Sequence, residues 1–174
     1  MKKENGVFMF DTSHLHPMIV HFPIALLMVG FLSEIIGLTL KKEFFTKAAF
    51  YLLILGTLGV VAAYITGDIA GDGVSETGQL KNALETHEHA AQFTLWLMVG
   101  AAIARIALVW LKKLDGILKY AAFVLFLAGV LSVARTGYYG GELVYKHAAG
   151  VQFNFGLDQN TNGQNTTAGE DDED

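Results

Sequence analysis

The stretch AAFYLLILGTLGVVAAYIT, residues 48–66, decides the fold of this chain, because it runs for 19 residues without a charged side chain. A helix that crosses the hydrocarbon core of a bilayer needs about 20 apolar residues. Three further stretches of similar length, each interrupted by one or two charged residues, are 18–40, 90–111 and 118–138. Membrane-spanning backbone of this kind must be helical, because lipid offers it no hydrogen-bonding partners. The sequence therefore predicts an all-α integral membrane protein with four spans.

The composition of the whole chain agrees with a membrane protein. Hydrophobic residues make up 52% of it and charged residues only 17%, whereas soluble domains carry about 25% charged residues. The absence of cysteine excludes disulfides, thiolate metal sites, iron–sulfur clusters and covalently attached haem within the chain. The net charge of −5 comes mainly from acids near the C-terminus. No nucleic acid or other polyanion is therefore expected as a partner.

The four stretches belong to one expected domain, residues 1–151, followed by a tail at 152–174. The tail is rich in Asn, Gln, Thr, Gly and acids, a composition that cannot form a core and predicts disorder. The short connections 41–47 and 112–117 force neighbouring helices to run antiparallel. These features predict an up-down four-helix bundle.

The lysines predict the orientation of the bundle. Six of them follow the first and third spans, at Lys41, Lys42, Lys47, Lys112, Lys113 and Lys119. The positive-inside rule places these connections in the cytoplasm and both termini outside. The sequence thus predicts a multi-pass membrane protein with both termini outside, which in a bacterium means the outer side of the inner membrane.

All six histidines fall on the opposite side of the predicted bundle from these lysines. They are His14, His16, His21, His87, His89 and His147. Imidazole is a ligand for haem iron, zinc and copper, and it titrates near neutral pH. The alternative is that histidines, with tyrosines and tryptophans, simply meet water at the membrane interface.

Helical spacing predicts that His87, and not His89, faces the interior. Pro17 favours a helix that begins there, which makes His16 an entry residue and His21 the helical histidine of the first span. Glu34 and Arg105 lie at similar depth within the first and third spans, and buried membrane charges usually pair, so we expect them to be in contact. His16 precedes Glu34 by 18 residues, and His87 precedes Arg105 by 18. Eighteen residues are five helical turns, so each histidine should share a face with its charge. His21 lies about 140° around the helix from His16.

Arg135 is the charged residue of the fourth span nearest the predicted outer face. Two interpretations remain open for it. It pairs with Asp68 at similar depth, or it binds a haem propionate, since arginine binds carboxylates well.

Two motifs resemble those of a bacterial membrane family, domain of unknown function 2231. They are LHPMIVHFPIALL at 15–27 and GGELVYKH at 140–147, and His87-Glu88 resembles the family's middle histidine. The resemblance covers residues 14–151 and implies a four-helix bundle, electron transfer and a b-type haem. By position, it identifies His16, His21, His87 and His147 as the family histidines. Ala148 and Ala149 stand where a glycine often follows the last histidine.

The resemblance leads to the hypothesis of a haem b protein that exchanges electrons with quinol or a cytochrome at the outer face. Haem would be held by two of the four histidines, with His21 and His87 the favoured pair, and Arg135 near a propionate. A second hypothesis is transition-metal binding or transport, with His21 and His87 as metal ligands. A third is a non-catalytic assembly subunit of a respiratory complex.

Overall fold

The computed structural model describes residues 15–71 and 78–149, and these residues form four helices. They are α1 (Leu15–Leu40), α2 (Glu43–Gly71), α3 (Gly78–Trp110) and α4 (Gly116–His147). The described residues contain no strand, and all four helices are long and apolar enough to cross a membrane. The prediction of an all-α, four-helix membrane bundle is confirmed. The predicted tail at 152–174 lies outside the described residues.

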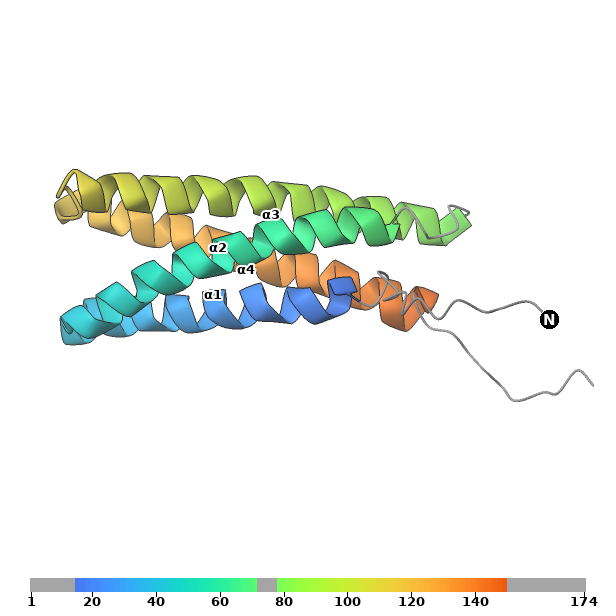
Figure 1. Cartoon of the computed structure of the whole chain (residues 1–174), viewed down its shortest axis with the longest axis horizontal. Helices are drawn as coiled ribbons and strands as arrows, with labels where there is room; N and C mark the ends of the chain where they lie inside the picture. Colours follow the sequence, from blue (N-terminus) through green and yellow to red (C-terminus); the bar gives the residue numbers. More distant parts are fainter. Residues whose placement is uncertain (1–14, 72–77, 150–174) are drawn as a thin grey trace, which may run out of the picture.

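The helices form two antiparallel hairpins that pack against each other (Figure 1). The most extensive contacts join α1 to α2 and α3 to α4, and smaller ones join α2 to α3 and α1 to α4. Helix α2 runs obliquely, from beside α1 at one end of the bundle towards α3 at the other (Figure 1). Within the described residues, the backbones of α1 and α3 do not approach each other. These two helices therefore face each other diagonally across the bundle.

The outer surface of the bundle is apolar over the middle of every helix. Leu32 is 55% exposed, Leu58 60%, Ile103 61% and Leu131 61%. Contiguous exposed apolar surface of this kind is rare in soluble monomers and is what lipid requires. The interior holds a compact cluster consisting of Leu27, Leu53, Val60, Met98, Phe126, Val130 and Val133.

The helices are longer than the apolar stretches from which the spans were predicted. Helix α3 begins at Gly78 rather than near residue 90, and α4 continues to His147 rather than ending near 138. The charged turns at the helix ends still complete their backbone hydrogen bonds, and i,i+4 ion pairs such as Glu43–Lys47, at 2.8 Å, support them. Hydropathy thus correctly located the membrane spans, but the helices continue beyond the apolar stretches at their ends.

Glu34 and Arg105 form the predicted contact across the bundle. Nη2 of Arg105 donates to both carboxylate oxygens of Glu34, at 2.9 and 2.7 Å. Glu34 is 1% exposed and Arg105 4%. Because the backbones of α1 and α3 stay apart, only long side chains span this diagonal. The prediction of a Glu34–Arg105 pair is confirmed.

Ala148, which follows α4, has a φ of 50° in the left-handed region. Its N–H donates to the carbonyl oxygen of Val144, and the N–H of Ala149 donates to that of Leu143. This region costs a non-glycine residue roughly 1–2 kcal/mol, and glycine is the usual residue at this capping position. Ala148→Gly should therefore raise the free energy of unfolding by up to about 1 kcal/mol. Thermal unfolding in detergent tests this. An unchanged or lower unfolding temperature would show that the conformation carries no strain.

Candidate functional site: a histidine pair across the bundle

His16 on α1 and His87 on α3 meet at the end of the bundle opposite the lysines. Their ring centroids are 6.4 Å apart and the ring planes are inclined by 77°. Both side chains are half-buried. At 1.5 Å per residue, five helical turns separate this pair from the Glu34–Arg105 pair by about 27 Å along the axis. Glu34 itself lies six residues before the end of α1, so the histidines lie at or just beyond the far side of a hydrocarbon core that is roughly 30 Å thick.

Each of the two rings is held by the backbone of a neighbouring helix. Nδ1 of His16 lies 3.0 Å from the carbonyl oxygen of Ala63 on α2, and Nδ1 of His87 lies 3.2 Å from that of Thr136 on α4. A carbonyl oxygen only accepts, so Nδ1–H must donate in both contacts. In a neutral imidazole this leaves the lone pair on Nε2. An Nδ1–H bond to a carbonyl is the usual way to orient a ligating histidine.

Two glycines make room for the rings. A Cβ added at Gly67 of α2 would lie 2.9 Å from Cε1 of His16, and one at Gly140 of α4 would lie 3.2 Å from Cε1 of His87. The first distance is below the range that real Cβ atoms adopt. The helix that supplies the carbonyl acceptor for each histidine therefore also supplies a gap for its ring.

A small hydroxyl network lies behind His87, between α3 and α4. Oγ1 of Thr94 lies 2.5 Å from Oγ of Ser132 and 2.9 Å from Oγ1 of Thr136. Thr136 is also the residue whose carbonyl accepts from His87. Thr94 and Ser132 are buried, and buried hydroxyls that satisfy one another fix the packing of their helices. This network holds the acceptor of His87 in place.

The other predicted site residues are arranged differently from this pair. His21 is exposed, and its Nδ1 lies 2.5 Å from the carbonyl oxygen of Pro17 in its own helix. His147 is the last residue of α4 and is half-buried, and His89 is exposed. His14 lies outside the described residues. The inward-facing histidine of α3 is His87, as the 18-residue spacing predicts. The structure pairs it with His16 rather than with His21, which was the favoured partner.

Arg135 is exposed, and its guanidinium carbon lies 5.3 Å from the ring centroid of Tyr139. This is a cation–π contact one helical turn along α4. In the described part of the chain it forms no ion pair with Asp68, so that interpretation is wrong. Arg135 directly precedes Thr136 in α4 and is therefore close in the chain to the acceptor of His87.

The geometry of the histidine pair suits a metal that needs few protein ligands. A metal between two imidazoles, with metal–nitrogen distances of about 2.0–2.1 Å, places the ring centres roughly 6 Å apart, close to the observed 6.4 Å. No three His, Cys, Asp or Glu side chains in the described residues are grouped to hold a metal ion. Zinc sites use three or four protein ligands. Haem iron takes at most two protein ligands, which is the number of imidazoles in this pair.

Sequence reasoning missed the groups that hold the rings. The anchors are main-chain carbonyls, which every residue has, so side-chain chemistry gives no signal for them. A weak signal exists in the spacing of small residues: Ala63 and Gly67 are four apart on α2, and Ser132, Thr136 and Gly140 are four apart on α4. Each set lies along one helix face.

The fold and this arrangement define a multi-pass membrane protein with a histidine pair at one end of its bundle. Residues 12–153 match the family described as predicted membrane protein DUF2231, and the chain belongs to this family. Comparison with curated proteins and with solved structures gave no match.

Proposed function

We propose that this protein binds haem b between His16 and His87 and transfers electrons at the outer face of the bacterial inner membrane. The observation that carries the proposal is the anchored pair: two imidazoles on diagonal helices, each with Nδ1–H on a neighbouring carbonyl and with ring centroids 6.4 Å apart. Haem, when bound, supplies one-electron redox chemistry. The family membership agrees with a membrane protein and leaves its activity open.

The chain's own residues have distinct roles in this proposal. His16 and His87 present Nε2 to the iron, and the carbonyls of Ala63 and Thr136 keep both rings oriented. Arg135 is available for a propionate, because it is exposed and directly precedes Thr136 in α4. His21 and His147 are then free for another task at this face, such as accepting the protons released when quinol is oxidised. Quinol or a cytochrome is the proposed redox partner.

The absorption spectrum of the purified protein, expressed with ample haem, tests the proposal directly. Reduced-minus-oxidised difference bands of a b-type haem, with about one haem per chain, are the expected result. Metal analysis of the same sample separates the two cofactor hypotheses. Stoichiometric zinc or copper without haem would instead favour a transition-metal binding protein and would overturn the haem proposal.

Crowding the rings should weaken haem binding. In Gly67→Ala, the added Cβ meets the ring of His16, and in Gly140→Ala it meets that of His87. We expect both variants to retain less haem than the native chain, with the larger loss in Gly67→Ala because its contact is shorter. Haem per chain after purification is the measurement.

Gly137→Ala is the matched control for these two variants. Gly137 also lies in α4, but no side chain or neighbouring backbone lies within 4 Å of its added Cβ. This variant should keep the native haem content. Equal haem loss in all three variants would indicate a general effect on the helices and would argue against a site at the histidine pair.

A further inference from the structure

A cavity of about 300 Å³ lies at the lysine end of the bundle, far from the histidine pair. It lies between α2 and α3, which are in less extensive contact than the helices of each hairpin. Its lining combines charged and polar side chains with apolar ones. The lining residues are Glu43, Thr46, Lys47, Phe50, Tyr51, Arg105, Val109 and Leu114.

The lining of this cavity contains two cations and an unused donor. Lys47 pairs with Glu43 at 2.8 Å, but its side chain is 66% exposed, so it remains accessible to a further anion. Arg105 bonds to Glu34 through Nη2 alone. Within the described residues, its buried Nε has no acceptor. A buried donor without an acceptor is costly, and the residue that carries it also lines the cavity.

The charge around the cavity also favours an anion. The chain segments that flank this end carry six lysines but only two acids, Glu43 and Asp115. The cavity walls face the lipid side: Tyr51 is 62% exposed and Val109 41%. A ligand that fits must therefore have a negative headgroup and an apolar body.

We propose that this cavity binds the phosphate headgroup of an anionic phospholipid, with its acyl chains along the lipid-facing surfaces of α2 and α3. Basic pockets between membrane helices are known to take such headgroups. Lys47 and Arg105 are the two cations of the lining that bind the phosphate. The site shares no residue with the histidine pair, so the lipid-binding proposal can be tested independently of haem binding.

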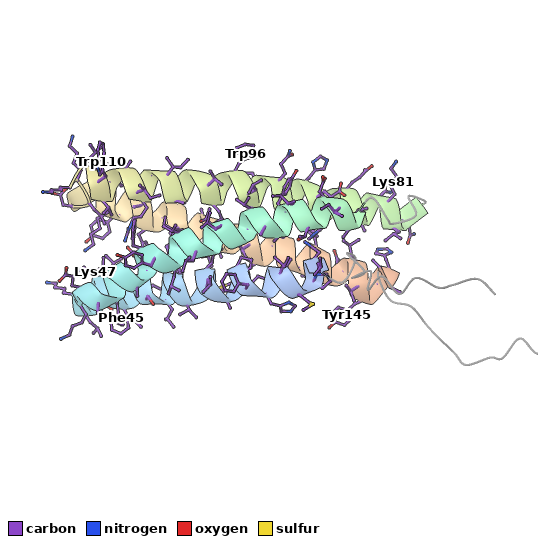
Figure 2. The ribbon with its side chains drawn as sticks, viewed as in Figure 1. Phe45, Lys47, Lys81, Trp96, Trp110 and Tyr145 are labelled. Carbon is purple, nitrogen blue, oxygen red and sulfur yellow. The ribbon has the colours of Figure 1, made fainter. Side chains whose placement is uncertain are left out.

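Tryptophan fluorescence offers a local readout of lipid at this cavity. The chain has two tryptophans: Trp110 is 81% exposed and follows the lining residue Val109, and Trp96 is 67% exposed. Figure 2 shows Trp110 at the same end of the bundle as Lys47, with Trp96 further along α3. Trp96→Phe therefore leaves a reporter at the cavity, and Trp110→Phe leaves one away from it.

The experiment reconstitutes these single-tryptophan proteins in vesicles of phosphatidylcholine containing brominated phosphatidylglycerol or brominated phosphatidylcholine. Bromine quenches a tryptophan that it contacts. We expect brominated phosphatidylglycerol to quench Trp110 more than brominated phosphatidylcholine does, and we expect no such preference at Trp96. Lys47→Gln should lower the affinity of the cavity for phosphatidylglycerol, relative to phosphatidylcholine, about five-fold, as expected for the loss of one lysine at a membrane surface. Inorganic phosphate should not compete, because it lacks the acyl chains.

Two lysines serve as matched controls for Lys47→Gln. Lys113→Gln removes a charge at the same end without touching the lining, and Lys146→Gln breaks an i,i+4 pair with Glu142 at the other end. Both should retain the preference at Trp110. The proposal is overturned if Trp110 shows no preference, if Lys113→Gln lowers it as much as Lys47→Gln, or if inorganic phosphate abolishes it. The last result would assign the site to a free oxyanion.

Discussion

Replacing Glu34 with leucine is expected to lower the free energy of unfolding by about 3–5 kcal/mol, the usual cost of removing one partner of a buried ion pair. The reason is Arg105, which is 4% exposed and would keep its charge in an interior that no longer contains a counterion. Thermal unfolding of the purified protein in detergent micelles measures the effect. This loss of unfolding free energy should be the largest that we predict for any single substitution.

The double variant Glu34→Leu, Arg105→Leu distinguishes the contribution of the two charges to stability from that of the volume that the side chains fill. Replacing a whole buried pair by apolar residues is often neutral or stabilising, so this variant should recover most of the loss. Glu43→Gln is the surface control, because the Glu43–Lys47 pair is exposed and its removal should leave unfolding unchanged. A double variant as unstable as Glu34→Leu would mean that the charges themselves are required.

Removal of either paired histidine is expected to abolish haem retention, whereas removal of His21 should not. His16→Ala and His87→Ala each leave the iron with one protein ligand and an empty space beside it. His21→Ala removes a side chain that is exposed and bonded to its own helix. Haem per chain and the difference spectrum after purification measure the result, with circular dichroism to confirm that each variant is helical.

Adding imidazole to the buffer tests whether the haem loss in these variants is caused by the missing ligand itself. A free imidazole can occupy the space left by His87→Ala and restore the missing ligand, so a recovered haem spectrum is expected there. No such recovery should follow when Gly67→Ala blocks the ring of His16, because that histidine is still covalently present. Haem loss in His21→Ala, with full retention in His16→Ala, would assign the iron to His21 and contradict the pairing proposed from the structure.

The fold was predictable because membrane spans give a strong and local signal. Length and apolarity alone defined four helices, and the lipid leaves helix as the only backbone solution for them. The helix ends were less predictable: Glu43 and His147 lie within helices although hydropathy excludes them. Charged turns can remain helical beyond the membrane, and hydropathy does not report that.

For the candidate site, helical periodicity could predict which side chains face the interior of the bundle, but not which of them contact each other. Counting turns from Arg105 correctly placed His87 on an inward face, because five turns preserve the face of a straight helix. The same count could not select the partner of His87, since this depends on which helices are diagonal. The contacts of Nδ1 with Ala63 and Thr136 depend on interhelical distances and on backbone atoms, which sequence patterns do not encode.

The side-chain contacts between the diagonal helices α1 and α3 have a consequence for how the protein assembles in the membrane. The α1–α2 hairpin carries Glu34 and His16, and the α3–α4 hairpin carries Arg105 and His87. A hairpin that enters the membrane during synthesis therefore carries one uncompensated charge and half of a ligand pair. Charged residues in lipid are costly until they are partnered. We therefore expect the first hairpin to gain its counterion and its second imidazole together, in the step in which the two hairpins pack against each other.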